Sequence, residues 1–188
     1  AGRGTPPEMM SWNGVGRDGN LVQSAEDYTV ELTVSDELKN VTEVEQMLPI
    51  DLLVMRQGDT LKVMLPNIQF APNTTDFFYF DEDLAEQNIE TLQKLAKVLK
   101  RYGYEITVEG HAVKVFWAYP EKGRIEQEEV LIPLSVARAK EVKKALAVLG
   151  VDRDKINTTG LGGSEPLVPH GDLERRWINR RAEFNVPK

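Results

Sequence analysis

Arg138 stands out among the charged residues of this chain, because a cation in the first turn of a predicted helix faces the positive end of the helix dipole. Its guanidinium, together with the unpaired backbone N–H groups of that turn, could form a receptor for a carboxylate or another anion. The plainer alternative is an ion pair with Glu141, three positions on, worth roughly a few tenths of a kcal/mol. The stretch alone favours the ion pair.

Histidines and neighbouring acids are the other candidate reactive groups. His111 with Glu109 could act as a base and its partner, but no nucleophile motif or phosphate-binding loop accompanies them. His111 and His170 are far apart in the sequence without metal-ligand spacing around them, and the absence of cysteine excludes disulfides and thiolate metal sites. The sequence therefore predicts no catalytic residue, no metal and no cofactor, in a protein that is not an enzyme.

The helix that carries Arg138 is predicted to begin near Pro133 and to end at Leu149. Ser135 can cap the amides of its first turn, and Gly150 stands where a left-handed C-terminal cap belongs. Residues at steps of three and four form its apolar stripe, namely Val136, Ala139, Val142, Leu146 and Leu149.

Strands alternate with helices from residue 48 onward. Leu48–Met55 and Leu61–Leu65 are apolar strands that turn residues join into a predicted hairpin. A helix is predicted with Asp83 as its cap and an end near Arg101. Further strands are expected at 104–110, 156–160 and 181–186, with a helical turn at 172–178. The order from Leu61 is β-α-β-α-β-(α)-β, which indicates an α+β fold with helices over one face of a mixed sheet.

The first 47 residues form a β pattern of their own. Tyr28–Val34 alternates strictly, which predicts a strand with one buried face, and Val41–Val44 could run back beside it. With the turn signals around Gly14 and Gly19, the pattern resembles the closing strands of the immunoglobulin-like (Ig-like) β-sandwich of flagellar-hook-capping proteins and bacterial surface repeats.

That resemblance covers only a terminal portion of a sandwich, and a few strands cannot bury both faces of one. The missing strands are therefore expected upstream, in a longer parent protein. Alternatively, the hairpin packs on the next domain. The predicted domains are a partial Ig-like β segment at 1–47 and a main domain at 48–188.

Composition excludes several classes of function. The net charge of −7 and a pI near 5.0 argue against a nucleic-acid surface. No apolar run is long enough to span a bilayer, so no transmembrane segment is predicted in this chain. A hydrophobic content of 41% over 188 residues is enough for a domain with a real core.

Several stretches of the main domain match one family in their order along the chain. They are Val108–His111 at a strand end, Leu134–Val142 at the start of a helix, Gly162–Pro166, and Asn179–Phe184. Together they look like the C-terminal domain of outer membrane protein A and of peptidoglycan-associated lipoproteins, the OmpA-like family. The similarity spans about Leu61 to Lys188.

The resemblance implies a periplasmic module that holds the cell wall without covalent bonds, associated with the outer membrane through its parent protein. Its ligand would be peptidoglycan, bound by the diaminopimelate side chain, which ends in an ammonium and a carboxylate. In typical members an Asp after a Gly-His pair accepts the ammonium, and the Arg that matches Arg138 takes the carboxylate. The other implied groove residues are His111, Asn179, Arg180 and Arg181.

This chain departs from the family pattern in three places. Val113 stands where the Asp belongs, and Leu131 replaces an Asn three positions before Leu134. Between His111 and Leu134 lie 22 residues, more than is usual in the family. Valine offers no lone pair, and truncating one side of a desolvated charge pair costs about 2–5 kcal/mol, or roughly 30- to several-thousand-fold in affinity. The predicted function is a structural or adaptor module with impaired or lost wall binding.

The long insertion, 112–132, leaves alternatives open, and it is expected to form a hairpin from Val115–Tyr119 and Ile125–Ile132. Its acids could supply a substitute acceptor that retains peptidoglycan binding, and its aromatic side chains could stack on a sugar. The plainer interpretation is a solvated acidic face, with aromatic side chains that pack over the core or plug the groove. A further possibility is a surface for other envelope proteins. The residues concerned are Glu126, Glu128, Glu129, Phe116, Trp117 and Tyr119.

Overall fold

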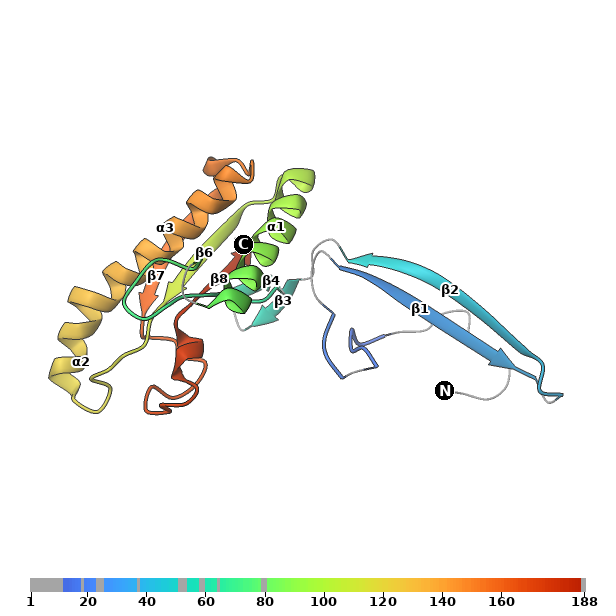
Figure 1. Ribbon diagram of the computed structural model, residues 1–188, viewed down its shortest axis with the longest axis horizontal. Coiled ribbons are helices and arrows are strands. Elements are labelled where there is room, and N and C mark those ends of the chain that lie inside the picture. The colour runs from blue at the N-terminus through green and yellow to red at the C-terminus, as the bar shows by residue number, and fades with distance from the viewer. Residues whose placement is uncertain are drawn as a thin grey trace.

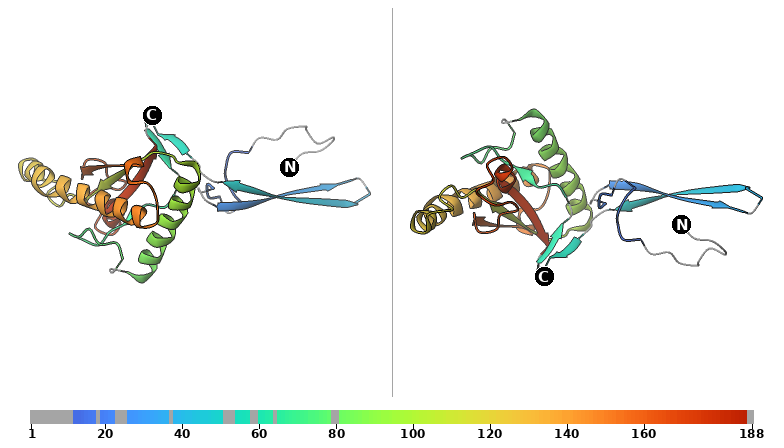
Figure 2. Two further views of the ribbon diagram at one scale, coloured as in Figure 1. Left: turned by 90° about the horizontal axis from the view of Figure 1, so that it is seen from above. Right: turned by 90° about the horizontal axis from the view of Figure 1, so that it is seen from below.

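The chain forms a two-stranded sheet followed by an α+β domain (Figure 1). The computed structural model describes residues 12–17, 19–22, 26–36, 38–50, 54–57, 60–63, 65–78 and 81–186. Figures 1 and 2 show the two-stranded sheet as a long twisted hairpin that points away from the sheet and helices of the domain. No helix in the described part of the chain combines the length and the apolar character needed to cross a membrane.

The hairpin consists of β1 (Glu26–Ser35) and β2 (Val41–Ile50), which pair antiparallel with Leu32 opposite Val44. The predicted strand and its return are confirmed, but the buried face predicted for the strand is wrong, because Val30, Leu32 and Val34 are 46%, 40% and 40% exposed. The predicted domain boundary after residue 47 falls inside β2, because the strand continues to Ile50. The strand expected at 48–55 is therefore divided between β2 and β3 (Val54–Gln57), and residues 51–53 lie outside the described part.

Six strands form the main sheet, in the order β3-β4-β8-β6-β7, with β5 also paired to β8. Strands β6 and β7 are parallel, and the other neighbours are antiparallel, so the predicted mixed sheet is confirmed. The bounds of the strands not yet given are β4 (Thr60–Val63), β5 (Ile68–Gln69), β6 (Ile106–His111), β7 (Ile156–Gly162) and β8 (Arg181–Val186).

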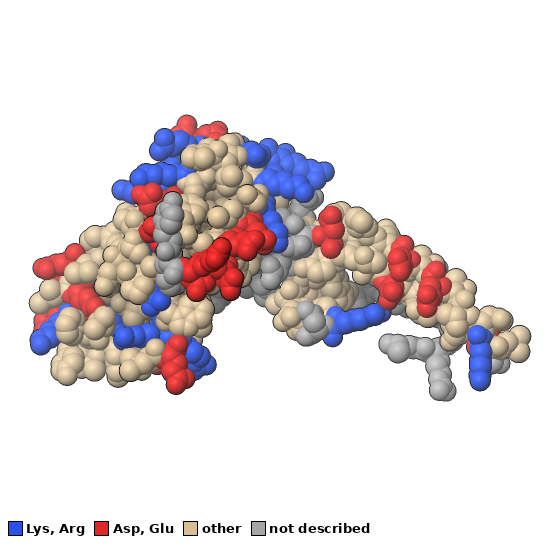
Figure 3. Space-filling view, viewed as in Figure 1, with Lys and Arg blue, Asp and Glu red and all other residues tan. Residues whose placement is uncertain are grey.

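Helix α1 (Glu82–Tyr102) begins two residues earlier than a cap at Asp83 would place it. The capping residue is Asp81, whose carboxylate accepts a hydrogen bond from the Leu84 N–H. Gly103 ends the helix in the left-handed conformation, with φ of 66°. Acidic residues in the first turn and basic residues in the last match the helix dipole, and Figure 3 shows the basic side chains gathered over the end of α1.

Helix α3 (Ile132–Val148) continues an already helical segment, and the hairpin predicted for the insertion is wrong. Residues 115–119 form a loop, α2 spans Pro120–Glu126, and a π-helical turn (Gln127–Leu131) leads directly into α3. The π turn precedes Pro133, which has no N–H to donate and whose ring crowds the carbonyl four residues back in a regular α-helix. Widening the turn to an i→i−5 hydrogen bond, from Ile132 N to Gln127 O, relieves that conflict.

The core lies between the helices and one face of the sheet. Alternate residues of β6 and β8, such as Val108 and Phe184, are buried against α1 and α3. Most of the predicted α3 stripe is buried there, including Ala139, Val142 and Leu146. Two short 3₁₀ turns complete the domain, Arg153–Lys155 before β7 and Arg176–Asn179 before β8. The second overlaps the helical turn predicted for 172–178 and ends one residue later, at Asn179.

Candidate functional site

Arg138 is buried, with 1% of its surface exposed, in the second turn of α3. Its guanidinium donates to three backbone carbonyls: Nε to Thr74 O at 3.0 Å, Nη1 to His111 O at 2.9 Å and Nη2 to Ala71 O at 3.0 Å. It also lies 4.9 Å from the ring centroid of Phe70. Arg138 thus joins the end of β6 to the loop that follows β5.

Two expectations about the surroundings of Arg138 are wrong, because the helix begins before Pro133. Glu141 pairs with Lys144 at 2.6 Å and not with Arg138. Ser135 lies inside the helical run and does not cap it. Its hydroxyl donates to Ile132 O and accepts from Gly162 N, so it ties α3 to the end of β7.

The charge of Arg138 is opposed by carbonyl dipoles and by no carboxylate within the described part of the chain. Burial, which has the larger effect, and the neighbouring positive charge of Arg180 together lower the pKa of Arg138 to about 10. At neutral pH the guanidinium is therefore still charged. Three of its N–H groups bond to protein, out of the five that an arginine carries.

The loop that provides two of these carbonyls is fixed from both sides. The buried Asn88 of α1 accepts from Gln69 N and donates to the carbonyls of Gln69 and Phe77. Arg180 donates through Nε to Phe70 O at 3.0 Å. Arg180 therefore lies on the same side as Arg138, as expected, and both arginines stabilise the backbone of the loop.

Asn179 and Arg181 have structural contacts of their own. Asn179 is fully buried, accepts from Leu167 N and Val168 N, and donates to Val168 O. Arg181 is the first residue of β8 and directly follows Arg180, so its side chain is directed to the opposite face of the sheet. There its Nε donates to Glu183 Oε1 at 2.6 Å and its Nη2 to Glu165 O at 3.2 Å. The five predicted groove residues are thus divided between two faces of the sheet.

Val113 and Leu131, the two departures from the family motif, differ in exposure. Val113 is half-buried just beyond β6, beside Ala112, whose N–H donates to Gly162 O. Leu131 is buried at the end of the π turn, on the helical face that also carries Ser135 and Arg138. Neither side chain offers a hydrogen-bond acceptor.

The insertion acids have mostly local partners. Glu126 accepts from the N–H groups of Val115 and Phe116, which fixes the loop before α2. Glu128 pairs with Arg124 at 3.0 Å. Phe116, Trp117 and Tyr119 remain largely exposed, at 42%, 54% and 61% of their surfaces, so the expectation that the aromatics pack over the core is wrong.

Gln127 and His170 connect the insertion to the loop after β7, and the sequence analysis assigned neither of them this role. Gln127 donates through Nε2 to Leu161 O and Ser164 Oγ and accepts through Oε1 from Gly163 N. His170 Nδ1 accepts from Lys114 N at 3.2 Å. Gln127 could have been found from its spacing, because it lies four residues before Leu131 and a helix would place both on the buried side.

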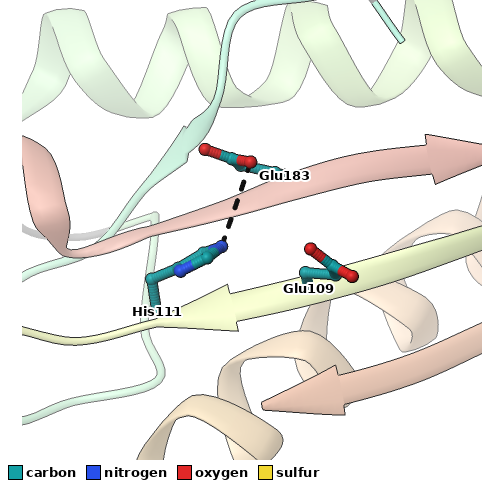
Figure 4. Close-up of side chains that lie close together, drawn as sticks. All are labelled: Glu109, His111 and Glu183. Atoms are coloured by element: carbon teal, nitrogen blue, oxygen red, sulfur yellow. Dashed lines mark ion pairs between the residues drawn. The ribbon is translucent and has the colours of Figure 1, made fainter. Parts of the chain in front are cut away.

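A second group of ionisable side chains lies on the sheet face opposite Arg138, and we call it the sheet-face cluster. It comprises Lys62 of β4, Glu109 and His111 of β6, and Arg181 and Glu183 of β8. Figure 4 shows the His111 ring directed toward Glu183, with Glu109 nearby on the same strand. The Glu-x-His and Arg-x-Glu spacings on two strands were the sequence signal for this cluster, because residues two apart on a strand share a face.

Burial and neighbouring charges set the protonation of this cluster. Burial lowers the pKa of His111 to about 4, with a further contribution from Arg181. Burial raises the pKa of Glu109. Burial alone would also raise the pKa of Glu183, but the hydrogen bond from Lys62 and the charge of Arg181 outweigh it and lower that pKa. His111 is therefore a neutral imidazole at neutral pH.

Comparisons with known proteins agree with this architecture. The OmpA family model matches residues 77–180. The probable lipoprotein YiaD of Escherichia coli is 30% identical over 71% of this chain and 54% of its own length. The peptidoglycan-binding protein ArfA of Mycobacterium bovis is 44% identical over 31% of this chain and 18% of its own. The matched part of this chain therefore covers about half of the length of the E. coli relative and less than a fifth of the length of the M. bovis relative.

Solved structures of OmpA-like proteins share this fold. The peptidoglycan-associated lipoprotein of Burkholderia pseudomallei superposes with a TM-score of 0.52 and 22% identity, over 64% of this chain and 89% of that one. The family match covers the sequence from Phe77, just before α1, to Arg180, just before β8, and so includes Arg138 and the whole insertion. This chain belongs to the OmpA family.

Proposed function

We propose that this protein is a non-enzymatic, structural or adaptor module of the cell envelope, in which the diaminopimelate site of the family is degenerate. The proposal is based on the two residues that occupy the ligand-binding positions of the family. Val113 offers no acceptor for an ammonium, and Arg138 is buried with its guanidinium hydrogen-bonded to three carbonyls. Wall binding is therefore impaired or lost.

Energetics support the same conclusion. An ammonium that enters the groove would lose water and find an isopropyl group in place of a carboxylate, at a cost of about 2–5 kcal/mol. A carboxylate that approaches Arg138 would have to use its remaining N–H groups or displace the carbonyls of Ala71 or Thr74. Both ends of diaminopimelate therefore meet a weaker partner than the family motif provides.

The position of the insertion supports an adaptor role. Helix α2 and the π turn extend α3, and Glu126 and Gln127 fix this extension to its neighbours. The exposed rings of Phe116, Trp117 and Tyr119 give it an aromatic surface suited to another envelope protein. The E. coli relative is named a probable lipoprotein, which supports a location in the cell envelope; we propose that this chain lies in the periplasm, associated with the outer membrane through a longer parent protein.

A second candidate is retained peptidoglycan binding through Arg138 and a substitute acid of the insertion. One observation favours it, namely that no carboxylate of the described residues neutralises the buried Arg138. Glu129 is the insertion acid best suited to this role, because Glu126 and Glu128 already bond to the backbone and to Arg124.

Co-sedimentation with purified sacculi that contain diaminopimelate distinguishes these functions. We expect no saturable retention of the wild-type chain and clear retention of Val113→Asp, because the carboxylate restores the ammonium acceptor. The paired change Val113→Asp with Arg138→Gln should lose that retention, which shows that the regained binding uses the family groove. Circular dichroism confirms that each variant is folded.

The contrary outcome is equally specific. Saturable retention of the wild-type chain that disappears in Glu129→Gln would establish the second candidate. Failure of Val113→Asp to bind, in a folded protein, would show that the surroundings of Arg138 block the groove independently of residue 113.

A further inference from the structure

The sheet-face cluster brings three potential metal ligands together from two adjacent strands. One ligand atom each from Glu109, His111 and Glu183 lies within 4.8 Å of the other two. The Nε2 atom of His111 is 4.0 Å from Oε2 of Glu183 (Figure 4). The β6–β8 pairing sets Glu109 directly opposite Glu183, so the backbone fixes the spacing of the two carboxylates.

His111 is the observation that points to a ligand. Its side chain is 1% exposed, and neither ring nitrogen has a hydrogen-bond partner in the described part of the chain. A buried polar group without a partner destabilises the folded state, so native proteins rarely retain one without a reason. A neutral imidazole can bind a transition-metal ion through a ring nitrogen without first losing a proton.

The cluster already binds a cation, supplied by the protein itself. The Lys62 ammonium lies against Oε2 of Glu183, the oxygen nearest to His111. Oε1 of the same carboxylate is held by Arg181 at 2.6 Å, an arrangement that orients the carboxylate from behind. The Lys62 side chain is 23% exposed and belongs to the short strand β4, so its ammonium can withdraw to solvent.

We propose that this cluster is a site for a divalent transition-metal ion, with Zn²⁺ as the best match, bound by His111, Glu109 and Glu183 after displacement of the Lys62 ammonium. One nitrogen and two carboxylate ligands with an open fourth position suit Zn²⁺, whereas Ca²⁺ and Mg²⁺ take oxygen ligands. Zinc distances of about 2.0–2.2 Å place tetrahedral ligand atoms about 3.4 Å apart. The ligand atoms of this site, which lie within 4.8 Å of one another, would therefore have to move closer together by up to about 1.4 Å when the ion binds.

Zinc titration of the full chain against a chromogenic chelator tests this proposal. We expect one tight site per chain, weakened roughly 10- to 100-fold or more in Glu109→Gln, which keeps the size of the side chain and removes its charge. Lys62→Met should tighten binding by about tenfold or more, because it removes a competing positive charge at contact distance. His170→Ala is the matched control and should bind like the wild type, since the chain has two histidines and no cysteine.

Two outcomes would overturn the site. The first is no zinc binding by either the wild type or Lys62→Met. The second is binding that Glu109→Gln and Lys62→Met leave unchanged, or that His170→Ala abolishes, which would assign the ion to another surface. The His111 imidazole resonances provide a direct readout, because they should shift with zinc and remain unchanged with Ca²⁺ or Mg²⁺.

Discussion

Asn179 determines the conformation of the loop at 164–170, because one buried side chain satisfies three backbone groups of that loop. Its Oδ1 atom accepts from Leu167 N at 2.8 Å and from Val168 N at 3.2 Å, and its Nδ2 donates to Val168 O at 2.8 Å. Resemblance to the family predicts Asn179 in the ligand groove, and its contacts give it a structural role in the neighbouring loop.

We expect Asn179→Ala to lower the free energy of unfolding by about 1–3 kcal/mol, because it leaves three partly buried backbone groups without their side-chain partner. Chemical denaturation monitored by circular dichroism measures the change. Asn157→Ala is the matched control, since Asn157 is exposed on β7, and should change stability by no more than about 0.5 kcal/mol. Equal effects of the two substitutions would show that the loop does not depend on Asn179.

Sequence reasoning located Arg138 but could not identify its partners. The family motif gives the position of the side chain, and the three carbonyls that bind it come from Ala71, Thr74 and His111. Backbone carbonyls carry no sequence signature, because every residue has one. Val113, in contrast, could be recognised from the sequence alone, because the chemistry lost there belongs to the side chain.

At the scale of elements, the insertion is where the local sequence pattern predicted the wrong secondary structure, a hairpin in place of a helix. Exposed apolar residues such as Ile125, Val130 and Ile132 suggested strands, because β-branched side chains favour them. The buried residues follow the helical spacing instead, with Gly123, Gln127 and Leu131 on the side that faces the domain. Strands β1 and β8 were predicted at the right positions because their apolar and polar residues alternate with the two-residue period of a strand.

Glycines at the strand ends allow α3 to approach the sheet closely. A Cβ atom on Gly110 would lie 1.9 Å from Ser135 O, and one on Gly160 would lie 2.4 Å from Val136 N. Both contacts involve the backbone of α3, which cannot move aside as a flexible side chain would. This close approach brings Arg138 within reach of the His111 carbonyl at the end of β6.

Gly110→Ala should therefore lower the free energy of unfolding by about 3 kcal/mol, the upper part of the range for overpacked cores. The reason is that α3 must move away from β6 to admit the methyl group. Urea denaturation measures the loss, and amide exchange should increase at residues 71–76, because Arg138 would no longer reach the carbonyls of Ala71 and Thr74. Glu105→Ala, an exposed change just before the same strand, should be nearly neutral. A stable Gly110→Ala variant would contradict this account of helix packing.

At the scale of the whole molecule, the core belongs to the main domain. All members of the hydrophobic core cluster among the described residues lie between Val63 and Phe184. The hairpin of β1 and β2 instead exposes much of its apolar face, including 46% of Val30, 40% of Leu32 and 55% of Val44. Its opposite face carries acidic residues, visible along the hairpin in Figure 3. A two-stranded hairpin of this kind is at best marginally stable by itself.

A fragment of residues 54–188 should therefore unfold cooperatively, with a free energy of unfolding within about 1 kcal/mol of the full chain, because it keeps all of β3 and the entire core. Denaturation of both chains by urea, followed by tryptophan fluorescence and circular dichroism, measures the difference. Trp117 and Trp177 remain in the fragment and report on the domain. A larger loss would mean that the hairpin packs on the domain, whereas equal stability leaves its apolar face available to strands of a partner.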